Sequence, residues 1–336
     1  MYFLFLIQVI VNNFNYDYVK QQIKKLLFRA VNKRLNADRP IGFLLSGGLD
    51  SSLILAIAAK LLKPENIVCF SIGLPGSQDI IAAQEVVEFL GVKNHHVVNF
   101  TLQEAFDTIP DVIRDIGSYD VTTIRASVPQ YLLAKYISEN TDVKVLLSGE
   151  GSDEIHGSYR YFRDAPDNVS FDNDRSRLLN NLYHFDNLRT DRTMASHGLE
   201  VRVPFLDFKY VEFIMSLSGE YFRHSREKME KLIIRESFDK ILPDNILFRS
   251  KEAFSDAVSN NTENWAEYIK SRAADLIHDN DQIYLFNPPQ SVDAIYFRKI
   301  FDNYYPGCDN IIPYYWLPRF QKTIVTDPSA TILECY

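Results

Sequence analysis

The amino-acid sequence predicts an α/β fold, a doubly wound parallel sheet with a mostly helical C-terminal half. Short apolar runs that are typical of buried strands alternate with segments of helical spacing in the first half. Such alternation indicates successive βαβ units. From about Asp174 onwards strand signals fade and helical periodicity dominates, as in 228–238. We therefore expect an α/β part at 16–165 and a mainly helical part at 166–336 that packs on it as one continuous body.

The predicted elements follow from periodicity and from the residues that end each run. Helical spacing is seen at 16–36, 53–62, 80–90 and 126–139, and short apolar or β-branched runs predict strands at 41–45, 67–72, 95–100 and 143–147. Gly91 is the expected C-cap of the third helix, and the sequence Thr101–Glu104 is a capping box that opens another. Ser46, Gly73 and Ser148 each follow a predicted strand. Because ligands bind beyond the carboxyl ends of parallel strands, these three residues should line one crevice.

Composition excludes some classes of function. The chain has 336 residues, of which 46% are hydrophobic and 24% charged, as in ordinary globular proteins. Its net charge of −8 argues against a general nucleic-acid-binding protein, which needs a basic face. Cys69, Cys308 and Cys335 are widely spaced and form no metal-binding pattern. A reducing compartment, and hence the cytoplasm, is the expected location.

Residues 1–11 are almost wholly apolar, and we treat 1–15 as a separate segment. The run is too short to cross a bilayer, and it lacks the basic start and small-residue cleavage site of a signal peptide. We interpret it as a buried strand or a docking segment. A signal sequence, a membrane anchor and a misplaced reading-frame start are the alternatives. No other stretch reaches membrane length, so we expect no membrane association.

The stretch 46–52, with the sequence SGGLDSS, is the strongest functional signal. It lies between a predicted strand and a predicted helix, where the N–H groups of the first helical turn favour an anion. Glycines allow close backbone approach, and the serines add hydroxyl donors. Asp50 cannot donate to phosphate, so we expect it to hold a hard cation. The alternative is a tight turn with a serine N-cap. The loop is neither a Walker A motif nor a dinucleotide fingerprint, and it resembles the pyrophosphate loop of N-type ATP pyrophosphatases.

Three further segments carry weaker signals. Residues 147–154 follow a strand and hold three acids among glycines, which predicts a nearby cation, although a solvated acidic turn is possible. Residues 121–127 precede a predicted helix and suit a carboxylate or phosphate, with an N-cap and a surface arginine as the alternative. Residues 249–256 place two cations on a polar loop, which alone indicates nothing. The aromatic residues of the last forty positions are interpreted as packing.

Together, in this order, the segments resemble the synthetase domain of the B-type, glutamine-hydrolysing asparagine synthetases, within the PP-loop ATP pyrophosphatase superfamily. The resemblance runs from about Tyr16 to the C-terminus. It rests on SGGLDSS at 46–52, GLPGSQD at 73–79, YDVTTIRAS at 119–127, LSGEGSDE at 147–154, GLEVRVPFLD at 198–207 and KEAFSDAV at 251–258. It implies a sheet of the adenine-nucleotide α-hydrolase type. It also implies ATP-dependent synthesis of asparagine from aspartate through a β-aspartyl-AMP intermediate, with release of AMP and pyrophosphate.

The resemblance also implies roles for individual residues. Catalysis falls to Glu150, which manages the proton of ammonia, and to Lys251, which stabilises charge on the α-phosphate. Nucleotide contacts are implied for Leu44, Ser46, Gly47, Gly48, Asp50, Ser51, Ser52, Ile72, Ser148 and Gly149. Mg²⁺ would be held by Asp50 and Asp153. The aspartate pocket would be shaped by Thr122, Thr123 and Arg125.

The chain departs from the family pattern in three places. Tyr2 stands where the family has the cysteine nucleophile of an N-terminal glutaminase domain, so that domain is expected to be missing and ammonia is the expected nitrogen donor. Ala257 replaces a usual glycine, and His156-Gly157-Ser158-Tyr159 replaces a usual Phe-Gly-Gly-Tyr run; we expect tuning rather than loss. The expected partners are small molecules: aspartate, ATP and ammonia. A homodimer, a separate glutaminase that supplies ammonia, a related amide-forming or lactam-forming synthetase and a non-catalytic relative remain alternatives.

Overall fold

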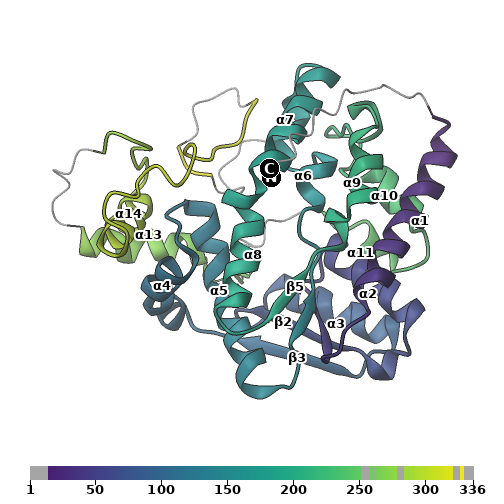
Figure 1. Cartoon of the computed structure of the whole chain (residues 1–336), viewed down its shortest axis with the longest axis horizontal. Coiled ribbons are helices and arrows are strands. Elements are labelled where there is room, and N and C mark those ends of the chain that lie inside the picture. The colour runs from purple at the N-terminus through teal and green to yellow at the C-terminus, as the bar shows by residue number, and fades with distance from the viewer. Residues whose placement is uncertain (1–13, 251–257, 261, 278–283, 321–325, 329–336) are drawn as a thin grey trace.

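The computed structural model describes residues 14–250, 258–260, 262–277, 284–320 and 326–328 (Figure 1). Its centre is a five-stranded sheet in the order β3-β2-β1-β4-β5. The strands are β1 Ile41–Leu44, β2 Val68–Gly73, β3 Asn94–Asn99, β4 Val145–Leu147 and β5 Glu200–Arg202. All neighbouring strands pair in parallel. The predicted parallel α/β fold is confirmed.

Each face of the sheet has its own hydrophobic core, because successive strand residues point to opposite faces. On β2, Cys69 joins one core and Phe70 the other, and on β4 Leu147 and Leu146 divide in the same way. All four side chains are buried. This explains why the strands read as continuous apolar runs rather than as an alternating pattern.

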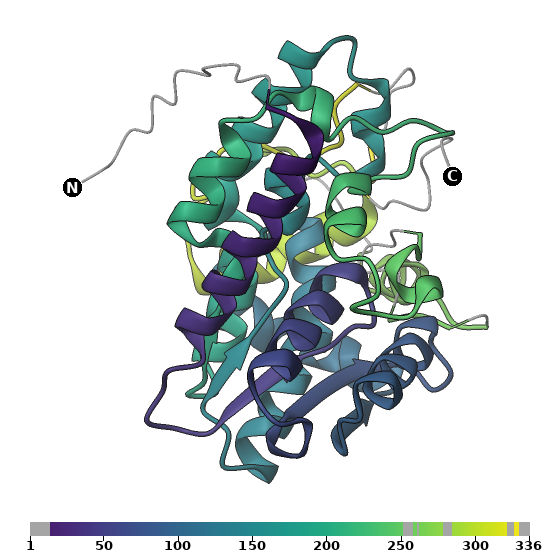
Figure 2. The same ribbon diagram turned by 90° about the vertical axis from the view of Figure 1, so that its right-hand side faces the viewer.

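Helices cover both faces, as Figures 1 and 2 show. The helices α1 Tyr16–Arg34, α2 Leu49–Leu61 and α3 Gln78–Leu90 contribute apolar side chains to the core that contains Cys69. The helices α4 Leu102–Ile116 and α5 Val121–Asn140 contribute to the core that contains Phe70. β1 pairs with both β2 and β4, and the strand order reverses direction there. Such a switch point is where open α/β sheets bind ligands.

The remainder of the chain is mainly helical. Its helices are α6 Ser152–His156, α7 Asn168–Asn181, α8 Asp186–Ala195, α9 Phe208–Met215, α10 Leu232–Ser237, α11 Asp244–Leu247, α13 Trp265–Leu276 and α14 Val292–Tyr304. Short 3₁₀ helices are η1 Pro64–Asn66, η2 Arg160–Asp164, η3 Leu182–His184, η4 Pro204–Leu206 and η5 Gly219–Tyr221. None of the helices in the described part of the chain combines the length and apolarity that a bilayer crossing requires.

Local predictions met different outcomes. Gly91 ends α3 in the left-handed conformation, with φ of 70°, and the Thr101 hydroxyl accepts from the N–H of Glu104 at 3.2 Å. The sequence analysis missed β5, since it expected no strand in the second half. This edge strand has only three residues, Glu200 is exposed and no apolar run marks it. The prediction for residues 1–15 falls mainly outside the described residues.

Candidate functional site

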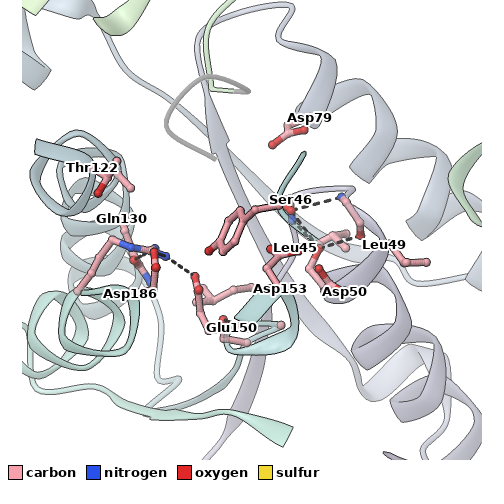
Figure 3. Close-up of a pocket in the computed structure, with 18 of the residues that line it drawn as sticks. Leu45, Ser46, Leu49, Asp50, Asp79, Thr122, Gln130, Glu150, Asp153 and Asp186 are labelled. Atoms are coloured by element: carbon pink, nitrogen blue, oxygen red, sulfur yellow. Dashed lines mark hydrogen bonds and ion pairs between the residues drawn. The ribbon is translucent and has the colours of Figure 1, made fainter. Parts of the chain in front are cut away.

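A cavity of about 240 Å³ lies beyond the carboxyl ends of β1, β2 and β4. Eleven of the residues singled out from the sequence line it: Leu44, Ser46, Gly48, Asp50, Ser51, Ile72, Thr122, Ser148, Gly149, Glu150 and Asp153. In Figure 3, Ser46, Leu49 and Asp50 face Thr122, Gln130 and Asp186 across the cavity, with Glu150 and Asp153 between them. The predicted convergence of loops that are distant in sequence is therefore seen for Ser46 and Ser148.

The loop between β1 and α2 is shaped to receive an anion. Gly48 is the N-cap of α2, and no side chain caps this end of the helix. The Ser46 and Ser51 hydroxyls lie 3.1 Å apart, and the backbone N–H of Ser46 donates to Ser51 Oγ at 3.2 Å. Gly47 has φ of 75°, and a Cβ there would lie 2.6 Å from the backbone nitrogen of Ala83. Only glycine fits this turn, which presents the helix N-terminus to the cavity.

The β4–α6 loop packs directly on this phosphate-type loop. A Cβ added at Gly149 would lie 2.7 Å from the backbone nitrogen of Ser51 and 2.9 Å from the carbonyl carbon of Asp50. Such contacts are sterically forbidden, so this position requires glycine. The close approach brings two acids, Asp50 and Asp153, to one place.

A buried lysine joins these acids. Lys231 Nζ lies 2.6 Å from Asp50 Oδ2 and 2.6 Å from Asp153 Oδ1. The lysine side chain is 2% exposed, whereas those of Asp50 and Asp153 are 16% and 15% exposed. All three residues line the cavity. One positive charge thus balances part of a doubly negative pair that is accessible from the cavity.

Each acid also accepts a hydrogen bond from a serine hydroxyl. Ser152 Oγ donates to Asp50 Oδ1 at 2.7 Å, and Ser152 in turn contacts His156 Nδ1 at 3.2 Å. Ser158 Oγ donates to Asp153 Oδ1. His156 and Ser158 belong to the run 156–159, one of the three places where the sequence departs from the pattern it resembles. This departure therefore involves residues that support the acid pair.

The acid pair has the donor chemistry of a magnesium site. Mg²⁺ prefers oxygen ligands and is usually held by one or two carboxylates together with substrate phosphates. Here two carboxylates meet a cation, the Lys231 ammonium, beside a phosphate-type loop. Among the described residues no group of three or more His, Cys, Asp or Glu side chains converges. The pair thus fits a metal that arrives with a nucleotide better than one caged by protein alone.

Glu150 pairs with an arginine, Arg189, rather than with Lys231. Arg189, on α8, donates from Nη2 to Glu150 Oε1 at 2.9 Å and to Asp186 Oδ1 at 3.1 Å, and from Nη1 to Gln130 Oε1 at 2.7 Å. Its Nε is buried with no hydrogen-bond partner among the described residues. Burial disfavours its charge, but Glu150 and Asp186 outweigh burial and raise the pKa of Arg189. The result is a fixed guanidinium on the cavity wall beside the candidate base.

A third acid of the same segment, Glu154, is not among the lining residues. Glu154 is 3% exposed and accepts from the Tyr159 hydroxyl at 2.6 Å. Burial, reinforced by the charges of Asp186 and Asp153, raises its pKa well above the ordinary value. Its carboxyl is therefore biased toward the protonated form.

The sequence predicts that 121–127 precedes a helix. In the structure this segment is itself helical and forms the first two turns of α5. Asp120 is the N-cap, and its carboxylate accepts from the Thr123 N–H at 2.8 Å and from the Thr122 hydroxyl at 2.7 Å. The residues of α5 that line the cavity are Thr122, Ala126, Gln130 and Leu133. Their spacing marks one face of the helix.

Arg125 lies on another face of α5 and is not a lining residue. Its guanidinium is 1% exposed and donates to Asp293 Oδ2 at 2.6 and 3.0 Å and to Asp327 at 3.0 and 3.1 Å. These bonds tie α5 to α14. Thr123 is buried and also absent from the lining. The geometry therefore gives no support to the prediction that Thr123 and Arg125 contact aspartate.

Two more predicted residues are not among those that line the cavity, and a third cannot be placed. Gly47 shapes the turn without lining it, and Ser52 is fully buried, with no partner for its hydroxyl among the described residues. Lys251 lies outside the described residues. Its neighbours Arg249 and Ser250 line the cavity, and Arg249 pairs with Asp79 at 2.8 Å.

Sequence reasoning missed Lys231 and Arg189. Lys231 stands in a run of mixed charges, 226–231, that looks like a solvated surface. Arg189 belongs to a helix with polar residues on most sides. An available signal was the pair of acids expected at Asp50 and Asp153, since carboxylates that lie close together favour a nearby cation.

Comparison with known proteins agrees with this geometry. The family described as "Asparagine synthase" matches residues 22–177 and 165–310. A probable asparagine synthetase [glutamine-hydrolyzing] from Acanthamoeba polyphaga mimivirus is 58% identical over 95% of this chain and 58% of its own length. Asparagine synthetases [glutamine-hydrolyzing] from Gallus gallus and Homo sapiens are 43% and 41% identical, over 97% and 96% of this chain and 59% of their own lengths. The chain thus spans about three fifths of the length of these relatives.

Two solved structures are similar at low sequence identity. An NMN synthetase from Francisella tularensis is 13% identical, with a TM-score of 0.36 over 94% of this chain and 99% of its own. An NH3-dependent NAD synthetase from Campylobacter jejuni is 14% identical, with a TM-score of 0.29 over 53% of this chain and 78% of its own. The family match covers most of the chain, and it agrees with the cavity and the ordered motifs. The chain therefore belongs to the asparagine synthase family.

Proposed function

We propose that this chain makes asparagine from aspartate, ATP and ammonia, with release of AMP and pyrophosphate. One observation carries the proposal: a single cavity gathers an anion-binding helix N-terminus, a carboxylate pair and a glutamate–arginine pair. Membership of the asparagine synthase family supports it. The proposal concerns synthetase chemistry, because the chain spans about three fifths of its relatives.

The first step activates aspartate. An oxygen of its side-chain carboxylate attacks the α-phosphorus of ATP, and the bond to the bridging oxygen breaks to release pyrophosphate. The N–H groups at the start of α2, with Ser46 and Ser51, hold the phosphates in place. Asp50 and Asp153 would hold Mg²⁺, which offsets phosphate charge when bound. Lys251 is proposed to stabilise the α-phosphate.

The second step forms the amide. Ammonia attacks the activated carbonyl, the carbon–oxygen bond to AMP breaks, and the nitrogen loses a proton. Glu150 is the proposed acceptor of that proton, since a positioned carboxylate acts as a general base. Arg189 fixes the position of Glu150 through the 2.9 Å bond.

Recognition of aspartate needs a cation for its other carboxylate. We assign this role to Arg189, because it is an arginine that lines the cavity. Thr122 lies on the same side of the cavity as Gln130 and Asp186, opposite Ser46, and contributes to the wall of the same pocket (Figure 3). Leu44 and Ile72 supply an apolar wall for adenine.

The test measures pyrophosphate and asparagine with purified chain, ATP, Mg²⁺ and aspartate. Ammonium should support both products, and glutamine alone should not. Asp50→Ala is the control and should lose aspartate-dependent pyrophosphate release while circular dichroism stays unchanged. Absence of asparagine with ammonium would refute the proposal, whereas activity with glutamine would refute only the nitrogen source. A homodimer, a glutaminase partner and a cytoplasmic location stay predictions.

A further inference from the structure

Lys231 occupies the position where a cation between Asp50 and Asp153 would bind. Its ammonium is 2.6 Å from an oxygen of each carboxylate. At such distances the ammonium fills the space between the two oxygens. A divalent ion bound to the same pair would stand in direct contact with a like charge, which is strongly unfavourable.

The lysine is held there by its backbone. Lys231 is the N-cap of α10 and adopts φ of 54°, a left-handed conformation that is unfavourable for a residue other than glycine. Its carbonyl accepts from the N–H groups of Ile234 and Arg235 at 2.9 and 3.0 Å. Next to it, Arg235 pairs with Glu230 at 2.6 Å. Glu230 thus pairs with Arg235, whereas the Lys231 ammonium contacts both Asp50 and Asp153.

The acids cannot turn away from it freely. Ser152 fixes Asp50 Oδ1, and Ser158 fixes Asp153 Oδ1. Both carboxylates are more exposed to the cavity than the lysine is. A cation that entered from the cavity would therefore meet two carboxylates whose negative charge the Lys231 ammonium already partly neutralises.

We propose that Lys231 competes with the divalent cation for the Asp50–Asp153 pair, so that the metal binds tightly only together with nucleotide. This inference rests on the proposed function, since it takes the pair as the magnesium site. The phosphates of a bound nucleotide add negative charge and oxygen ligands in the same cavity. The phosphates therefore favour the metal over the Lys231 ammonium at the two carboxylates. The displaced ammonium can then pair with a phosphate oxygen. Metal and nucleotide then bind with positive coupling.

The test uses Mn²⁺ as the probe and follows free Mn²⁺ by electron paramagnetic resonance. Wild-type chain without nucleotide should bind Mn²⁺ weakly, and α,β-methylene-ATP should strengthen that binding. Lys231→Met should bind Mn²⁺ without nucleotide more tightly by about tenfold or more. Equal Mn²⁺ affinity of the two proteins without nucleotide would overturn the proposal.

Two further proteins keep the test decisive. Lys231→Met combined with Asp50→Asn keeps the local charge balance but breaks the pair, and it should lose the gained Mn²⁺ binding. If it keeps that binding, the metal assignment itself is wrong. Lys231→Gln retains polar contacts and serves if the methionine variant does not fold; Mn²⁺ should raise its unfolding temperature but not that of the wild type. A gain of Mn²⁺ binding in a chain that makes no asparagine would refute the proposed function and leave this inference standing.

Discussion

Glu150 and Glu154 are two acids of one short segment with opposite environments. Glu150 lines the cavity and accepts from the Arg189 guanidinium. Glu154 is buried, and its raised pKa favours the protonated form. Only the first of these acids is thus placed to exchange a proton with a ligand in the cavity.

This contrast predicts the effect of Glu150→Gln, which keeps the shape of the side chain but removes the base. Asparagine formation should fall by about 10²–10⁴, the usual contribution of a general base. ATP binding should be retained. Glu154→Gln is the matched control, because glutamine resembles a protonated acid, and it should cost far less activity. Steady-state asparagine synthesis with both variants checks this, and a loss below about tenfold for Glu150→Gln would make Glu150 structural.

At this scale the sequence located the contiguous part of the site. The stretch 46–52 carries its geometry locally, because glycines and a helix N-terminus define it whatever surrounds them. Lys231 could not be placed, since its partners Asp50 and Asp153 lie 181 and 78 positions away. Arg189 and Glu150 are 39 positions apart. Such pairs are created by tertiary packing, which no local pattern encodes.

Among the elements, α5 shows how helical register divides residues that are neighbours in sequence. Thr122, Ala126 and Gln130 line the cavity, whereas Arg125 points toward Asp293 and Asp327. The sequence predicts that 121–127 precedes a helix, and outside a helix any of its side chains could turn toward a ligand. Once the segment is a helix capped by Asp120, only one face can do so. Arg125 lies on a different face of the helix, where it pairs with two buried aspartates instead of a ligand.

We therefore predict different consequences for Arg125→Lys and Arg189→Lys. Arg125→Lys should mainly lower stability, since a lysine cannot reproduce bonds to two buried carboxylates; removal of a partner from a buried pair costs about 3–5 kcal/mol. Arg189→Lys should raise the KM for aspartate by about tenfold or more, because the planar fork is lost. Denaturant unfolding and aspartate titrations on both variants separate the two roles. A raised aspartate KM with unchanged stability in Arg125→Lys would contradict this assignment.

Across the whole molecule, the sheet brings distant motifs to one edge, and this was predictable because parallel strands share a carboxyl end. The edge strand β5 was not predictable from its three half-exposed residues. Two buried histidines, His156 and His224, and the half-buried His95 were equally unpredictable, because the sequence does not show whether a histidine is buried. Burial is the first cause of the lowered pKa of His95, His156 and His224. Protonation of these groups is linked to global stability.

His224 gives the clearest test of that linkage. It is 4% exposed, its Nε2 lies 3.2 Å from the Gly157 carbonyl oxygen, and its Nδ1 is buried without a partner among the described residues. Burial, with the charge of Arg163, lowers its pKa from 6.5 to about 4. Below about pH 6.5 the unfolded chain therefore binds a proton that the folded chain refuses, so the free energy of unfolding falls as pH decreases toward about 4.

His224→Gln keeps a donor for Gly157 but does not titrate. Its stability should decline less steeply than that of the wild type in this window, by at most about 1.4 kcal/mol per pH unit. Above pH 7 the difference between the two proteins should be constant. Carboxyl groups titrate alike in both, so subtracting the two curves removes their contribution. Urea unfolding at closely spaced pH values measures the difference, and parallel curves from pH 7 to 4 would show that His224 accepts its proton in the folded state as readily as in the unfolded one.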